Sequence, residues 1–232
     1  MSIWERVEQT PAPRTLDYDR IASAAVAIAD EDGLDAVSMR RLASDLGVAT
    51  MALYRYVRNK DDLLWLMADT VVTDVDLPDD PDADWRDVVR AHAAQIRAVI
   101  LAHPWLVAAG GRLPLGVTPA RLAIAESILQ ALDDAGLDAD TSYTAMTTLT
   151  SFVWGFAGGE VTQSELMRRH GWTSLADMRN EYGSEVRWLL DTGRFPLFRR
   201  WATTSAAKDD PDQRFALGLD SLIAGIATHH NI

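Results

Sequence analysis

The sequence predicts an all-α protein with a small helix-turn-helix domain at residues 1–67 and a larger helical domain at 68–232. Three observations favour this class. Apolar residues recur at helical spacing, glycines and prolines stand between the periodic segments, and alternating strand-like patterns of useful length do not occur. With 232 residues, 48% of them hydrophobic and 24% charged, the chain is long enough to bury a substantial core.

The ends of the first helices can be read from the residues that flank them. Asp17 and Ser38 are favourable N-caps, and Gly33 and Gly47 follow a last turn, where glycine accepts left-handed backbone angles. Asn59 caps a further helix whose first turn is acidic, which suits the helix dipole. The expected helices cover 18–32, 39–46, 51–56 and 59–75.

A loop separates these helices from the larger domain. Residues 74–84 hold two prolines and six acidic residues in eleven positions, which no packed helix accommodates. Beyond the loop, amphipathic segments alternate with glycine and proline breaks, and Thr118-Pro119 opens a helix with proline at its tolerated first position. The expected helices of the larger domain cover 85–102, 105–109, 118–135, 140–169, 174–190 and 211–229.

Composition excludes several classes of protein. The absence of cysteine excludes disulfides, cysteine-ligated zinc and thiol nucleophiles. The first residues lack the apolar core of a signal peptide, and no apolar run approaches the ~18 residues that span a bilayer. We therefore expect a cytoplasmic protein that makes no membrane contact.

Charge is distributed unevenly along the chain. The net charge is −12, yet residues 38–60 carry five basic side chains against the single acid Asp45. The 172 residues after this window hold 25 acidic and 14 basic side chains. A small cationic segment on an acidic body is typical of an anion-binding domain, although a solvated helical face gives the same count.

The cationic segment, SMRRLASDLGVATMALYRYVRNK, has helix-turn-helix spacing. Leu42 and Leu46 can pack the first helix inward, Gly47 allows a tight turn, and Val48 fills the angle between the helices. The second helix is then free to enter a major groove ~12 Å wide. An ordinary helical hairpin has the same spacing, so the pattern alone leaves both interpretations open.

Longer sequence strings add a specific likeness. ALYRYVRNKDDLL, preceded by SMRRLASDLGV and DEDGLDAVS, resembles the tetracycline-repressor (TetR) family of bacterial transcriptional regulators over residues 18–67. Over 85–232 the helix order is similar to the ligand-binding and dimerising domain of the tetracycline-repressor subgroup. The resemblance implies an all-helical homodimer that binds a palindromic DNA operator and is released by a small molecule.

The resemblance also implies particular DNA contacts. The recognition helix matches at Thr50 and the residues after it, the preceding helix at its start, and the fourth helix at Lys60. Arginine can read a guanine edge or hold a phosphate, and apolar side chains suit a thymine methyl group. We expect contacts from Met39, Arg40, Thr50, Met51, Ala52, Tyr54, Arg55, Tyr56 and Lys60. Two points stay open: Tyr54 is alternatively part of the core, and Ala49, a poor N-cap, leaves Thr50 as the alternative cap.

The larger domain supplies candidate ligand and dimer residues, each of which is alternatively plain core. Apolar helices with a few polar groups are what a small-molecule site requires. The candidate ligand residues are His92, Gln95, Ile96, Trp105, Thr147, Thr150, Trp154 and Trp172. The candidate dimer residues lie on one side of the last helix: Phe215, Leu219, Leu222, Ile223 and Ile226.

Metal and cofactor sites are not expected. The histidines form neither an i, i+4 pair nor an HExxH motif. In the tetracycline subgroup a turn before the pocket helix supplies a metal-bound histidine, but residues 113–119 contain none, and Asp74 to Asp76 stand where a drug-contacting histidine is expected. A ligand other than tetracycline is therefore predicted.

Two rival functions remain open. One is an enzyme that uses His92 with Asp87 or Glu126, although no nucleophile or phosphate-loop motif supports it. The other is a dimeric helical DNA-binding or interaction protein without a small-molecule ligand.

Overall fold

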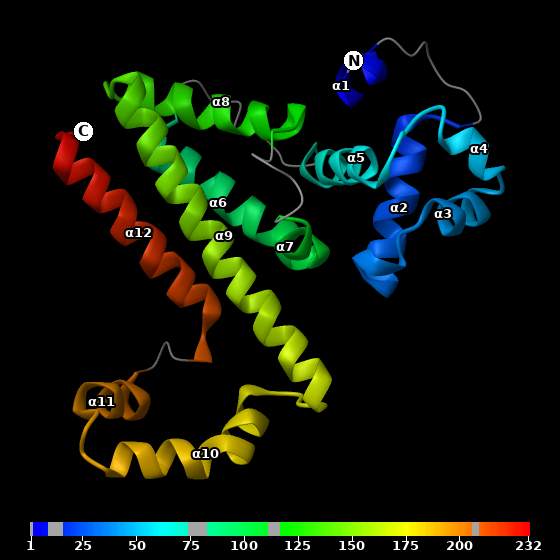
Figure 1. Ribbon diagram of the computed structural model, residues 1–232. Coiled ribbons are helices and arrows are strands. Elements are labelled where there is room, and N and C mark those ends of the chain that lie inside the picture. Colours follow the sequence, from blue (N-terminus) through cyan, green and yellow to red (C-terminus); the bar gives the residue numbers. More distant parts are fainter. Residues whose placement is uncertain (1, 9–15, 74–82, 111–116, 206–208) are drawn as a thin grey trace. The chain divides into compact units, whose positions relative to one another are not determined.

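The computed structural model describes residues 2–8, 16–73, 83–110, 117–205 and 209–232, and every regular element in these ranges is helical (Figure 1). The all-α prediction is confirmed. The helices are α1 (Ile3–Glu8), α2 (Tyr18–Asp32), η1 (Leu34–Ala36), α3 (Met39–Leu46), α4 (Thr50–Leu53), α5 (Lys60–Thr73), α6 (Trp85–Ala102), α7 (Trp105–Ala109), α8 (Pro119–Asp134), α9 (Ala139–His170), α10 (Leu175–Asp191), α11 (Pro196–Thr204) and α12 (Pro211–His230).

The predicted caps are present. Asp17 accepts a hydrogen bond from the backbone N–H of Arg20 at 2.8 Å, and Asn59 accepts one from the N–H of Asp62 at 2.8 Å. Gly47 closes α3 with a left-handed φ of 67°. These short-range signals fix where helices begin and end, which is why most predicted bounds match the structure.

Three elements were not predicted, namely α1, η1 and α11, and one differs in length. The helix expected over 51–56 is α4, which covers only Thr50–Leu53. The Tyr56 N–H donates to the carbonyl of Leu53 at 2.8 Å, so the chain turns tightly after α4 instead of extending it.

Contacts divide the chain into two compact units, Met1–Val153 and Trp154–Ile232. In the first, α5 packs against α2 and α8 and also contacts α6. Leu63, Leu64 and Met67 of α5 are fully buried, as expected for a helix that packs against several others. The predicted division at 67/68 falls inside α5 and stays a prediction. Hereafter "the head" means residues 16–73.

The second unit contains the end of α9 together with α10, α11 and α12. Phe156 and Phe215 meet edge to face with ring centroids 5.3 Å apart. At the α9–α10 corner the rings of His170 and Trp172 stack at 4.3 Å. None of the described helices in either unit has an apolar stretch long enough to cross a membrane.

Candidate nucleic-acid interface

Two buried leucines hold α3 and α4 in the head. Leu42 on α3 and Leu53 on α4 are both fully buried. Leu46 and Val48, which were expected to pack inward, are only half-buried. Leu42 and Leu53 therefore anchor the helix-turn-helix, and the faces opposite them remain outside the core.

The N-terminus of α4 has no side-chain cap. Ala49 occupies the N-cap position with extended backbone angles, and only its carbonyl is used, by the N–H of Ala52 at 2.8 Å. Thr50 is the first helical residue, so it does not replace Ala49 as the cap. Its hydroxyl is left to other partners at the exposed end of a short helix.

The outer side of α4 carries large side chains that the chain itself does not cover. Met51 is 74% exposed and Tyr54 44% exposed, directly beside the fully buried Leu53. Arg55 is also exposed, whereas Thr50 and Ala52 are half-buried. The exposure of Tyr54 disfavours the alternative in which it belongs to the core.

Neighbouring arginines on α3 differ in their partners. The Arg41 guanidinium lies 3.0 Å from Asp32 and 3.3 Å from Asp45, and hydrogen bonds to these two carboxylates raise its pKa. Arg40 and Arg55 have no ion pair or hydrogen bond with any side chain in the described ranges. The positive charge of the segment is therefore partly neutralised at Arg41 and left available at Arg40 and Arg55.

Tyr56 and Lys60 are held by the protein itself. The Tyr56 hydroxyl donates to the carbonyl of Leu16 at 2.7 Å, and its ring meets the edge of Tyr18. The Lys60 ammonium donates to the carbonyl of Leu34 at 3.3 Å, which leaves two of its three protons for another acceptor. Tyr56 is thus placed as an internal brace, and Lys60 retains donors for a phosphate.

In the larger domain, α6 carries buried polar atoms that lack partners. His92 is buried, and its Nε2 lies 3.0 Å from the Ser127 hydroxyl on α8, while its Nδ1 has no partner among the described residues. The Oε1 of Gln95 is also buried without a partner there. Burial lowers the pKa of His92, so its ring is neutral at pH 7. Such orphaned atoms are what a ligand would satisfy.

The other candidate ligand residues are placed differently. Trp105 is buried and donates its indole N–H to Asp30 at 2.8 Å, and Trp172 donates to Glu181 at 2.7 Å. The Thr147 hydroxyl bonds to the backbone of its own helix. Of the remaining candidates, Thr150 is exposed, and Ile96 and Trp154 are half-buried.

Two family models match the chain. Residues 21–65 match bacterial regulatory proteins of the tetR family, and residues 77–230 match the tetracyclin repressor-like C-terminal domain. The chain belongs to the TetR family. It is therefore a DNA-binding transcriptional regulator, as the exposed α4 and its neighbouring cations had indicated.

Proteins similar to this chain include two regulators and one solved structure. The HTH-type transcriptional repressor DrrR1 of Streptomyces coeruleorubidus is 34% identical, over 97% of this chain and 83% of that protein. An HTH-type transcriptional regulator of Saccharopolyspora erythraea is 37% identical, over 97% of this chain and 91% of that protein. The crystal structure of Streptomyces coelicolor ActR in complex with actinorhodin matches with a TM-score of 0.74 and 33% identity, covering 94% of this chain and 99% of that one.

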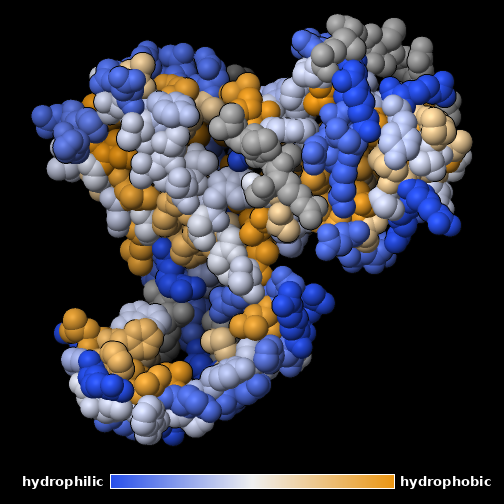
Figure 2. All heavy atoms as spheres, in the orientation of Figure 1, coloured by the Kyte–Doolittle hydropathy of each residue, from blue (hydrophilic) through white to orange (hydrophobic). Residues whose placement is uncertain are grey.

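The candidate dimer residues of this TetR-family chain fall into two groups. Phe215, Leu219 and Ile223 are buried within the single chain, which fits the alternative of intramolecular core. Leu222 and Ile226 are half-buried and remain available to a partner. Large exposed apolar side chains were missed on α10 and α11, where Trp188 and Leu197 are 67% and 68% exposed. Figure 2 shows hydrophobic surface over this part of the second unit.

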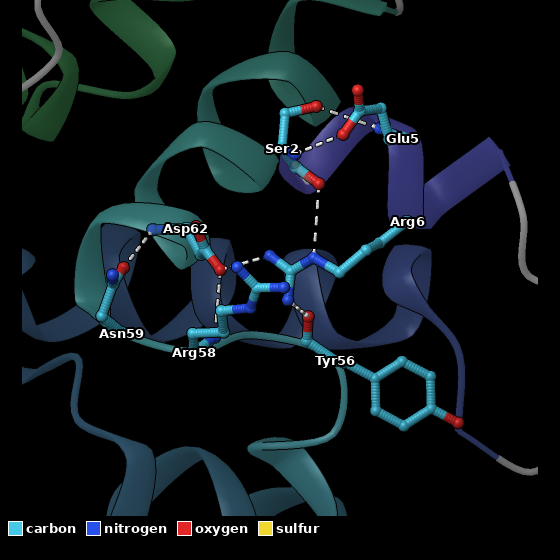
Figure 3. Close-up of polar contacts among 7 residues, drawn as sticks. All are labelled: Ser2, Glu5, Arg6, Tyr56, Arg58, Asn59 and Asp62. Carbon is cyan, nitrogen blue, oxygen red and sulfur yellow. Dashed lines mark hydrogen bonds and ion pairs between the residues drawn. The ribbon is translucent and has the colours of Figure 1, made fainter.

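Sequence reasoning also missed α1. Ser2 and Glu5 form a reciprocal cap, with the Ser2 N–H donating to Glu5 at 2.6 Å and the Glu5 N–H donating to Ser2 at 3.2 Å. The pattern Ser-x-x-Glu at residues 2–5 was the available signal. The helix places Arg6 beside Tyr56 and Asp62, at the turn that follows α4 (Figure 3).

The prediction of a ligand other than tetracycline depends on two stretches of sequence. Asp74 to Asp76, and residues 113–116 of the turn 113–119, lie outside the described residues. The prediction of a different ligand stands as a prediction. Among the residues that the structure describes, no three metal-ligating side chains gather into a cluster.

Proposed function

We propose that this chain acts as a homodimeric repressor whose two heads bind successive major grooves of a palindromic operator, and that a small molecule in the domain at 68–232 releases it. The observation that carries the DNA-binding part is the exposed side of α4. Met51 and Tyr54 stand out from a helix anchored by the buried Leu53, and Arg40 and Arg55 add positive charge that no carboxylate among the described residues pairs with.

Each side chain suits one kind of DNA contact. Arg40 can fork onto a guanine edge or clamp a phosphate, and Met51 suits a thymine methyl group. The Tyr54 hydroxyl and the free donors of Lys60 suit phosphates, which position the protein without reading sequence. Met39, Thr50, Ala52 and Arg55 complete the proposed contact surface, with Tyr56 supporting it from inside.

A second copy of the chain is the proposed partner of the second unit. Heads that read two half-sites must be held ~34–36 Å apart, which requires a rigid twofold dimer. Monomers rarely expose large contiguous apolar surface, and α10 and α11 expose Trp188, Leu197 and Phe198. We assign the dimer contact to these helices together with Leu222 and Ile226 of α12.

Coupling between ligand and DNA has a physical route within the first unit. Asp69 of α5 accepts a hydrogen bond from the Ala120 N–H at the start of α8, at 2.8 Å. Asp30 of α2 accepts from Trp105 and lies 2.9 Å from the Nδ1 of His103. Helices of the head are thus bonded directly to α6–α8, so a ligand that displaces those helices changes the placement of the head. Coupling of ~1–3 kcal/mol is typical.

The proposed ligand has an apolar body and at least one hydrogen-bond donor. Gln95 Oε1 can only accept, and the neutral His92 ring can serve either role at Nδ1. ActR, a protein similar to this chain, has been crystallised in complex with actinorhodin, which makes actinorhodin a reasonable first probe. The enzyme alternative required His92 to work with an acid such as Asp87. In this proposal His92 is paired with Ser127, and Asp87 is paired with Arg90 at 2.9 Å.

The test is binding of the full chain to the promoter of its own gene, measured by gel shift and by fluorescence anisotropy. A shift that survives competition by unrelated DNA and weakens when the small molecule is added supports the proposal. Absence of any sequence-specific shift contradicts it. A specific shift that no ligand alters, together with no ligand binding by calorimetry, favours the ligand-free alternative.

A further inference from the structure

Arg6 of α1 is buried, and burying a charged side chain costs the free energy of its lost hydration. Only 9% of the residue is exposed. Its Nη1 donates to the carbonyl of Tyr56 at 3.1 Å, its Nε donates to the carbonyl of Ser2 at 3.3 Å, and its Nη2 pairs with the carboxylate of Asp62 (Figure 3). Burying an ion is repaid only by good geometry, so this arginine is held in one position.

Two partners of Arg6, Tyr56 and Asp62, stand at opposite ends of one turn. Tyr56 closes the turn that follows α4, and Asp62 lies in the first turn of α5. The same Asp62 carboxylate accepts the Arg58 N–H at 3.0 Å, and the Asp62 N–H donates to Asn59 at 2.8 Å. Arg6 therefore bridges the turn, because it binds the Tyr56 carbonyl on one side of the turn and the Asp62 carboxylate on the other.

This turn sets the spacing between the proposed base-reading and phosphate-binding groups. Met51 and Tyr54 precede it on and just after α4, and Lys60 follows it at the start of α5. Tyr56 is braced on its other side as well, since its hydroxyl donates to Leu16. A shift of the turn would move Tyr54 relative to Lys60, and binding geometry must be held within ~0.5 Å to be productive.

We propose that Arg6 is a positioning residue for operator recognition: through Tyr56 and Asp62 it fixes α4 relative to the start of α5 without itself touching DNA. The inference rests on the proposed DNA-binding function. A direct phosphate contact would need the guanidinium at the surface, whereas it is buried against three acceptors from its own chain.

The test compares the full-length wild-type chain with Arg6→Gln and Arg6→Lys by anisotropy on operator and on unrelated DNA. Arg6→Gln is expected to weaken operator binding about tenfold, the scale of one lost charge-assisted hydrogen bond. Arg6→Lys should fall between, because an ammonium can pair with Asp62 but lacks the fork that also reaches Tyr56. Affinity for unrelated DNA should stay unchanged. Arg86→Gln, which removes an arginine paired with Asp84 outside the head, is the matched control and should leave operator binding intact.

Salt dependence separates positioning from contact. If Arg6 acts internally, the slope of log affinity against log salt is the same in Arg6→Gln and wild type. A slope reduced by ~0.9 means that Arg6 neutralises a phosphate, and this overturns the proposal. Unchanged operator affinity in Arg6→Gln, with wild type binding normally, overturns it too. Failure of the wild-type chain to bind any operator counts against the proposed function instead.

A double-mutant cycle guards against general loss of structure. If Arg6 works through Asp62, Arg6→Gln should weaken operator binding much less in an Asp62→Asn background than in wild type. Circular dichroism and thermal unfolding of each variant report folding. Additive losses in the cycle, or an operator defect that tracks only the fraction unfolded, overturn the proposal.

Discussion

The head buries most of its large apolar side chains, whereas the α10–α11 segment leaves large apolar side chains exposed. In the head, Leu42, Leu53 and Leu63 are fully buried, and the exposed cations Arg40 and Arg55 lie near the exposed side of α4. On α10 and α11, by contrast, Trp188, Leu197 and Trp201 remain exposed. The head completes its core within one chain and offers charge to an anionic partner. The described part of the α10–α11 segment leaves large apolar side chains exposed, and we propose that a second copy of the chain covers them.

The largest effect is expected from the core of the head. Leu53→Ala should lower the free energy of unfolding by ~2–5 kcal/mol, because it leaves a cavity at a fully buried site. Met51→Ala, two positions away but 74% exposed, should leave stability nearly unchanged. Urea denaturation followed by circular dichroism measures both. Similar losses in the two variants would contradict the division of α4 into a buried and an exposed side.

The next effect concerns the exposed segment. Leu197→Glu should weaken self-association by ~2 kcal/mol or more, since a charge replaces an apolar contact in the proposed dimer interface. Leu122→Glu on α8 is the control, because Leu122 is also more than half exposed but lies outside that segment. Sedimentation velocity gives the oligomeric state. A dimer that resists Leu197→Glu would remove α11 from the interface.

Two neighbouring arginines of the head, Arg40 and Arg41, differ in whether carboxylates of the same chain bind them. Arg40→Ala should cost ~1–3 kcal/mol of operator affinity, and Lys60→Ala should lower the salt slope by ~0.9 as one phosphate contact is lost. Arg41→Ala should cost less than Arg40→Ala, because Arg41 is already bonded to Asp32 and Asp45. Anisotropy over a series of salt concentrations checks all three. Equal losses at the two arginines would show that the internal ion pairs do not decide availability.

A smaller gain is expected where α4 lacks a cap. Ala49→Ser should stabilise the head by ~0.5–1 kcal/mol, since its extended backbone already has the N-cap geometry and serine supplies the missing acceptor. Thermal unfolding measures the gain, with Ala52→Ser as the control inside the helix. No gain at position 49 would indicate that the exposed N–H groups of α4 are already well satisfied by solvent.

The smallest effect at neutral pH comes from His92. Burial holds its pKa below the ordinary value of ~6.5, so above that pH the ring is neutral in both the folded and the unfolded chain. As the pH falls below ~6.5 the unfolded chain binds the proton first, and stability declines until the folded-state pKa is passed. In His92→Gln this decline should disappear from the range just below pH 6.5, as measured by urea denaturation at several pH values. An identical decline in the variant would assign it to other groups.

Local rules account for the part of the fold that the sequence predicted. Asp17, Ser38 and Asn59 cap helices through hydrogen bonds to N–H groups three residues away, and Gly47 adopts the left-handed angles that favour glycine. Because these interactions span a single turn, the residues themselves reveal them. The same reasoning predicted a short helix after Gly47, although α4 covers Thr50–Leu53 and not the expected 51–56.

Contacts between distant segments were beyond that reasoning. Residue types alone predict neither the Asp32 carboxylate beside Arg41 nor the Tyr56 hydroxyl against Leu16. The burial of Phe215, Leu219 and Ile223 within one chain likewise depends on which helices meet.

The sequence by itself determined the helices, their caps and the cationic window, since period, capping and charge are properties of neighbouring residues. Only the tertiary structure decided which cations stay available and which apolar faces stay open. The burial of Arg6 between Tyr56 and Asp62 shows why. Arg6 and Asp62 are 56 positions apart in the sequence, so their ion pair exists only once folding has brought these two residues together.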